Sequence, residues 1–187
     1  MRSIVPLFAF AIAAAAPALA VEPMPVPAFR SIELHGGGIV TIVPAAVQRV
    51  TLLEGTTQFT RVRVERDGKL VIDSCNQICP RDYRLRVEIE SPRVLGLAID
   101  GGGVMTSANG FAPQNELGVA VNGGGKIDAR SISAAHVGAA VNGGGVIMVR
   151  ARSALGATVN GGGEIRYWGD PAVATSVQGG GAVRKGR

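Results

Sequence analysis

Two cysteines, separated by three residues, carry the most reactive side chains of this sequence. Cys75 and Cys79 could form a disulfide, a redox pair or half of a zinc site. A redox pair usually has two intervening residues, and zinc needs four ligands, whereas His35 and His136 are the only histidines. In an oxidising compartment the favoured interpretation is a disulfide that fixes a short turn. We expect no metal and no cofactor.

Paired carboxylates are the second chemistry to consider, because sugar-cleaving enzymes use two of them around the scissile bond. Asp128 and Glu164 each follow a glycine triplet at a short offset. Opposite phases along regular strands are expected to place them on different faces. His136 is solitary, and a lone histidine is more often a surface or packing residue. We therefore expect no catalytic residues and no enzyme, and a carbohydrate-active enzyme is the alternative.

Arginines suggest a third kind of site. Arg61 and Arg63 alternate in one predicted strand, and Arg84 and Arg86 alternate in another. If those strands pair, the four guanidinium groups form one patch that would bind an anionic envelope glycan or lipid, with an affinity that falls as salt rises. A solvated sheet face without a ligand is the simpler interpretation of the same residues.

Glycine triplets are the strongest feature of the elements that must position these groups. They account for most of the 27 glycines, and from residue 97 onward they recur at intervals of 22, 20, 18 and 18 residues. The triplets span residues 36–38, 101–103, 123–125, 143–145, 161–163 and 179–181. A period near twenty with short apolar segments is typical of a β-solenoid, in which each coil buries its apolar face only by stacking on the next.

Apolar residues before and after each triplet are expected to stack as two inward rows, with the glycines at the corner between them. A polar residue precedes each of the last five triplets. These residues are Asp100, Asn122, Asn142, Asn160 and Gln178. Stacked amides at a corner can form a hydrogen-bonded ladder along the stack, which is a structural role. An amide-lined ligand groove is the alternative.

The first half of the chain carries β-branched and alternating segments rather than coils of this kind. Residues 39–43, 60–65, 70–72 and 84–89 read as strands. Arg66–Lys69 contains Asp-Gly, which predicts a hairpin between two of them. The fold class is therefore all-β: a single-domain parallel β-helix or β-solenoid with an N-terminal strand-and-hairpin half.

The N-terminus has the pattern of an export signal. Arg2 precedes thirteen mostly apolar residues, and Ala18-Leu19-Ala20 is a small-residue cleavage site. We expect a signal peptide at 1–20 and a proline-rich spacer at 21–28, with no membrane-spanning segment in the mature chain. Its charge would be one unit below the +5 of the whole chain. An exported protein has little occasion to meet nucleic acid, so no nucleic-acid partner is expected.

Several segments resemble one known family. The repeated Asn-Gly-Gly-Gly, the ending Glu164–Pro171 with a last triplet, and the opening Phe29–Gly37 and Gly68–Ile72 are similar to the head GIN domain, also called an auto-transporter adhesin domain. The resemblance covers about residues 29–185. It implies a β-helix-like fold in exported bacterial proteins and no transferable catalytic residues. Many members have Gly-Ser-Gly where this chain has Gly-Gly-Gly, and the Cys75–Cys79 loop is an addition.

Together these features predict a periplasmic or secreted module of the bacterial envelope that binds or supports and does not catalyse. Its domain would span residues 29–185, with an N-terminal half at 29–98 and a repeat half at 99–185. Adhesion is one such role. The partner is either an anionic glycan or lipid, or a second copy that associates through an exposed end of the stack.

Overall fold

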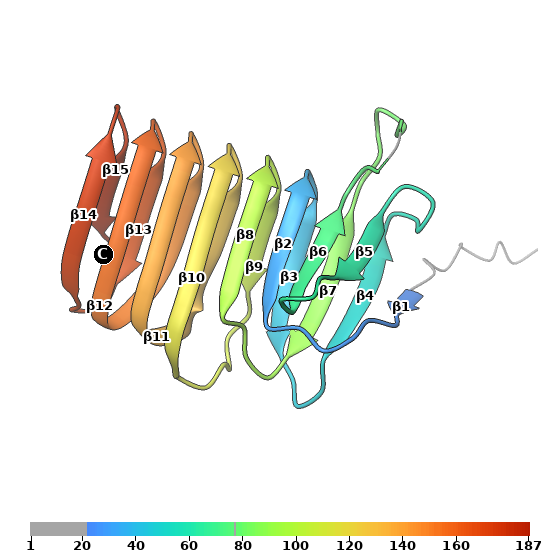
Figure 1. Cartoon of the computed structure of the whole chain (residues 1–187), viewed down its shortest axis with the longest axis horizontal. Helices are drawn as coiled ribbons and strands as arrows, with labels where there is room; N and C mark the ends of the chain where they lie inside the picture. Colours follow the sequence, from blue (N-terminus) through green and yellow to red (C-terminus); the bar gives the residue numbers. More distant parts are fainter. Residues whose placement is uncertain (1–21, 77) are drawn as a thin grey trace, which may run out of the picture.

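The computed structural model describes residues 22–76 and 78–187, and every regular element in this part of the chain is a β-strand. The expected signal peptide lies outside the described residues. The 15 strands belong to one sheet that doubles back on itself, so that strands lie in two facing layers (Figure 1). No helix capable of crossing a membrane occurs among the described residues. The all-β prediction is confirmed.

The first layer is a ladder of parallel strands that ends in one antiparallel pair, β5 with β6. In spatial order it contains β5 (Arg61–Val64), β6 (Lys69–Asp73), β2 (Ser31–Gly36), β8 (Gly96–Gly101), β10 (Gln114–Gly123), the later parts of β11 (Lys126–Gly143) and β12 (Val146–Gly161), and β14 (Ala172–Gln178). The β5–β6 pair is the hairpin expected around Asp67-Gly68.

The second layer is also mostly parallel, and two antiparallel pairs, β1 with β4 and β4 with β7, close its N-terminal end. In spatial order it contains β1 (Glu22–Met24), β4 (Arg49–Glu54), β7 (Arg86–Ser91), β3 (Ile39–Pro44), β9 (Val104–Ser107), the first parts of β11 and β12, β13 (Glu164–Trp168) and β15 (Ala182–Lys185). Strands β11 and β12 are long because each runs from one layer into the other.

Every glycine triplet forms a corner between the two layers. A coil here means one strand of the first layer, a corner, and one strand of the second. The coil β2–β3 has its corner at Gly36–Gly38, and Gly36 pairs in register with Gly101 of the next coil. The stack therefore starts before the boundary expected at residues 98 and 99, and the sequence missed this because 51 residues (45–95) separate these two coils.

Residues 45–95 close the N-terminal end of the stack. Strand β6 pairs with β2 in the first layer and β7 pairs with β3 in the second, so β6, the loop after it and β7 repeat the path of a coil without glycines at the corner. On the other layer, β1 pairs with β4, and Met24 and Val26 pack against the core. The segment expected to be only a spacer therefore takes part in the fold, because its apolar side chains alternate with prolines.

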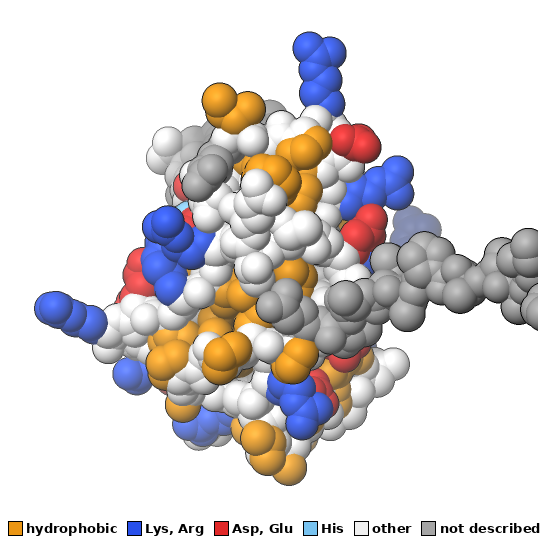
Figure 2. Space-filling view, turned by 90° about the vertical axis from the view of Figure 1, so that its right-hand side faces the viewer, with side chains coloured by type: hydrophobic (Ala, Val, Ile, Leu, Met, Phe, Trp, Pro, Cys, Tyr) orange, Lys and Arg blue, Asp and Glu red, His pale blue; other side chains and the backbone are white. Residues whose placement is uncertain are grey.

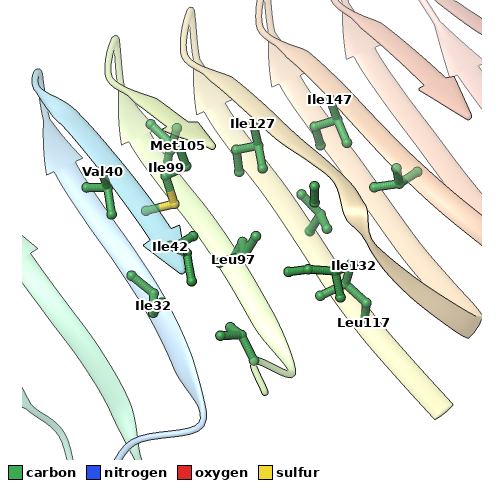
Figure 3. Packing of buried hydrophobic residues seen from close by; sticks show 14 of the residues in the cluster. Ile32, Val40, Ile42, Leu97, Ile99, Met105, Leu117, Ile127, Ile132 and Ile147 are labelled. Atoms are coloured by element: carbon green, nitrogen blue, oxygen red, sulfur yellow. The ribbon is translucent and has the colours of Figure 1, made fainter. Parts of the chain in front are cut away.

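The core lies between the layers. Each residue preceding a corner by one or three positions points inward, as does the residue two positions after it, and these side chains are buried along the stack. Ile99, Met105, Ile127 and Ile147 meet there from successive coils (Figure 3). The two inward rows expected from the sequence are present. Burial of this continuous apolar column is what holds coils that could not fold singly.

Candidate functional site

The polar residues before the triplets lie in one row along the corner edge. Asn142 donates from Nδ2 to Oδ1 of Asn122 at 2.9 Å, and Asn160 donates to Asn142 at 2.9 Å. Asp100 and Gln178 are in register with the two ends of this amide chain. These exposed side chains bond to one another, which is the arrangement expected of a ladder.

The same row continues into a charged cluster on β2, β6 and β5. His35 lies in register between Asp100 and Asp73. Its Nδ1 is 2.9 Å from Oδ1 of Asp73, and its Nε2 is 3.0 Å from Oε1 of Glu33. Lys69 also pairs with Glu33, at 2.7 Å. Because both ring nitrogens of His35 are occupied, neither is available as a proton-transfer group for a ligand.

Ionisation in this cluster follows from its contacts. Burial lowers the pKa of His35, but hydrogen bonds and charges from Glu33 and Asp73 outweigh it, so that the pKa is raised above 6.5. Burial raises the pKa of Glu33, and hydrogen bonds and charges from Lys69 and His35 reverse that effect, so that this pKa is lowered. The cluster is therefore a set of mutually satisfied charges on the sheet surface.

A disulfide-closed loop takes the place of the glycine corner above this cluster. Cys75 and Cys79 are bonded, with their Cα atoms 6.1 Å apart. Just before the loop, Ser74 donates its backbone N–H to the carbonyl of His35 at 3.0 Å, and its Oγ accepts from the backbone N–H of Gly37 at 3.1 Å. The loop is thereby fixed against the first glycine corner. The expected disulfide is present.

A pocket of about 730 Å³ opens between that corner and the loop. It is lined by Gly37, Gly38, Ile39, Glu54, Ser74, Cys75, Cys79, Pro80, Tyr83, Arg84, Leu85 and Arg86. It combines an apolar wall, two arginines and one carboxylate. It lies at the closed end of the stack, where Figure 2 shows basic side chains at the rim of the surface and apolar side chains between them.

Tyr83 gives the pocket a fixed wall. Its hydroxyl is 2.6 Å from Oγ1 of Thr60 and accepts from the backbone N–H of Thr56 at 3.1 Å. Its ring packs edge-on against Phe59, with centroids 5.4 Å apart. The loop after β4 thus supports the loop before β7, and the side of the pocket that both loops form is held by hydrogen bonds and ring packing.

The four-arginine patch does not form as the sequence suggested. Strand β5 pairs with β6, whereas β7 lies between β3 and β4, so the strands that carry the two arginine pairs belong to different layers. Arg63 forms ion pairs with Asp73 and Glu65. Arg84 and Arg86 line the pocket, are exposed, and make no ion pair with any of the described residues.

Glu54 and Tyr83 are pocket residues that the sequence gave no reason to select. Glu54 comes opposite Arg86 only through the antiparallel β4–β7 pairing. The available signal was the pairing of a cysteine loop with a glycine corner, and it becomes readable only when β6 is known to lie beside β2.

Asp128 and Glu164, the carboxylates considered for catalysis, lie on the same outward face of the second layer, in neighbouring rows and two coils apart. The expectation of different faces was wrong, because offsets of three and one residues have the same parity. Each carboxylate holds the arginine two positions later, Arg130 at 2.6 Å and Arg166 at 2.8 Å.

Both carboxylates remain ionised. Burial raises the pKa of Asp128, and the hydrogen bonds and charge of Arg130 reverse that effect and lower it. The hydrogen bond from Arg166 lowers the pKa of Glu164. A general acid needs the opposite shift, because it must stay protonated until it delivers its proton.

Solved structures share this architecture. A protein described as a "putative adhesin" from Bacteroides fragilis NCTC 9343 is 19% identical, with a TM-score of 0.56 over 91% of this chain and 98% of its own. A "putative adhesin" from Parabacteroides merdae ATCC 43184 is 14% identical, with a TM-score of 0.46 over 90% and 96% of the two chains. A "putative lipid binding protein" from Parabacteroides distasonis ATCC 8503 is 16% identical, with a TM-score of 0.42 over 89% and 96%.

The family comparison agrees with the repeat. No curated protein matches the chain in sequence. Residues 97–171, which cover four of the glycine corners, match the family described as "Putative auto-transporter adhesin, head GIN domain". The resemblance noted in the sequence is thus confirmed, and residues 97–171 of this chain belong to the head GIN domain family.

Proposed function

We propose that this protein is a non-catalytic binding module of the bacterial envelope, and that the pocket at the closed end of its stack binds the acidic group of an envelope glycan or lipid. The observation that carries the proposal is the pair Arg84 and Arg86, which line the pocket, are exposed and form no ion pair among the described residues. Guanidinium groups bind carboxylate and phosphate through paired hydrogen bonds.

The rest of the pocket favours a ligand that is both anionic and hydroxylated. Glu54 lines the same wall and lies opposite Arg86, so it can accept a hydrogen bond from a hydroxyl beside the acidic group. Ile39 is 42% exposed and, with Leu85 and Pro80, offers an apolar surface to a sugar ring or an acyl chain. Phosphorylated or uronic sugars and the headgroups of anionic lipids share this chemistry.

The scaffold suits such a role. In this proposal the two parallel ladders form a short β-solenoid, the amide row from Asp100 to Gln178 is structural, and one domain spans residues 29–185 behind a cleaved signal peptide at 1–20. The in-register pairing of successive coils and the family description as an adhesin support it. The protein would then work in the periplasm or outside the cell, where the cysteine pair can stay oxidised.

The test is a binding titration of residues 21–187 against three probes: soluble lipopolysaccharide core fragments, soluble peptidoglycan fragments and phosphatidylglycerol vesicles. The double variant Arg84→Gln/Arg86→Gln should bind the preferred probe at least about tenfold more weakly, since each charged hydrogen bond contributes roughly 1.5–3 kcal/mol. Raising the salt concentration should weaken binding by the wild type. The probe that binds tells a glycan from a lipid ligand.

Arg61→Gln is the matched control, because Arg61 is an exposed arginine of β5 that does not line the pocket. It should bind as the wild type does. Equal loss in Arg61→Gln and the pocket variant would mean a diffuse charge effect, and unchanged binding by the pocket variant would exclude the site. If none of the three probes binds, the pocket is not an acidic-ligand site of the envelope.

A further inference from the structure

The two ends of the stack are finished differently. At the N-terminal end, the outermost strands are β5, with four residues that include Arg61 and Arg63, and β1, with three residues that include Pro23. Short, charged or proline-containing edge strands resist the addition of further strands. This end is therefore protected in both layers.

The C-terminal end lacks these protections. Strand β14 pairs only with β12, so its other edge is free, and β15 likewise pairs only with β13. Strand β14 has seven residues, Ala172–Gln178, with no charge and no proline, and all seven are exposed. An uncharged free edge of this length is a template for strand pairing.

Apolar side chains continue the core onto this end. Val173 and Val177 are 40% and 43% exposed, whereas their register partners one coil earlier, Leu155 and Val159, are 1% and 0% exposed. The apolar rows that each coil buries against the next are thus left uncovered at the last coil. Burying them requires another strand with inward residues at the same spacing.

We propose that two copies of this chain associate end to end through β14, in antiparallel pairing about a twofold axis that passes beside Thr175. The sequence of β14 fits its own reverse. With Thr175 opposite Thr175 of the second copy, Val173 lies opposite Val177, Ala174 opposite Ser176, and no charge faces a like charge. An isologous contact of this kind closes after two copies.

The second layer is compatible with this arrangement. A twofold axis perpendicular to both layers brings β15 beside β15 of the second copy while it pairs the two β14 strands. Strand β15 carries Arg184 and Lys185, and Lys185 forms an ion pair with Asp170 within its own chain. The lysine charge is therefore compensated before the copies meet. The pocket of Arg84 and Arg86 lies at the other end and stays open in the pair.

Two measurements test the pairing. Sedimentation of residues 21–187 over a dilution series should show a reversible monomer–dimer equilibrium. Ala174→Lys places a charge on the free edge, where Ala174 is exposed, and should raise the dissociation constant about tenfold or more, because like charges across an interface are strongly unfavourable. Ser153→Lys adds the same charge at an exposed position of β12 and should not change it.

Cysteine cross-linking tests the register. Thr175→Cys should form an intermolecular disulfide under mild oxidation, because directly opposite residues have Cβ atoms about 5 Å apart. Gln178→Cys should not, because the proposed axis places it opposite Ala172. A monomer at every concentration, growth beyond dimers, or equal cross-linking of both variants would each overturn the proposal. None of these results bears on ligand binding by the pocket.

Discussion

Gly143, Gly144 and Gly145 show that the three positions of a corner are not equivalent. Gly143 has a φ of +118°, and a Cβ there would lie 2.7 Å from the carbonyl oxygen of Gly123. At Gly145 a Cβ would lie 2.4 Å from Cγ1 of Val121, but at Gly144 it would meet nothing within 4 Å. The outer two positions are therefore closed to side chains and the middle one is open, which explains why a serine fits there in relatives of this repeat.

Substitutions at one corner should follow this difference. We expect Gly143→Ala to lower the free energy of unfolding by about 1–3 kcal/mol through backbone strain, and Gly145→Ala by about 1–3 kcal/mol through overpacking. Gly144→Ser should stay within about 0.5 kcal/mol of the wild type. Urea unfolding of the three variants measures this, and a Gly144→Ser loss as large as that of Gly143→Ala would contradict it.

His35 makes a small part of the stability depend on pH. Because its pKa is raised in the folded state, the protonated ring stabilises the fold fully below the unfolded value of 6.5, and this contribution is lost as pH rises through the folded pKa. The side chain is 37% exposed, so solvent screens the effect and we expect less than about 1 kcal/mol.

The measurement is urea unfolding of the wild type and His35→Gln at about pH 5.5 and about pH 8.5, on either side of a typical histidine pKa. The difference in stability between the two proteins should be larger at the lower pH. An equal difference at both values, or a larger one at high pH, would show that Glu33 and Asp73 do not hold a protonated ring.

At the scale of elements, sequence periodicity predicted whatever depends on neighbouring coils. The glycine corners, the inward rows and the amide row of Asn122, Asn142 and Asn160 all follow from a spacing that can be read directly. The hairpin at Asp67-Gly68 was readable for the same reason, since a turn is a local feature.

Elements that pair over long sequence separations were not predictable. Strand β6 lies beside β2, and β4 turns antiparallel against β7, by pairings that no local pattern encodes. The division of the arginines followed from this, because Arg61 and Arg86 lie in different layers. The pocket was missed for the same reason: Glu54, Gly37 and Arg84 meet there from three separate segments.

At the scale of the whole molecule, stability should vary along the stack. Each coil contacts only its neighbours, so a coil in the middle is held on both sides and the last coil on one side. The antiparallel strands β5, β4 and β1 cover the N-terminal end, whereas β14 is exposed throughout. Local opening should therefore cost least at the C-terminal end.

Hydrogen exchange can measure this gradient and its dependence on association. In dilute protein, amides of β10 and β11 should exchange slowest and those of β14 fastest. Concentrating the protein should slow exchange in β14 selectively, because pairing with a second copy covers its free edge, and Ala174→Lys should abolish that concentration effect. Uniform exchange along the stack would instead mean that all coils open together, and the exposed end would then be as stable as the core that it extends.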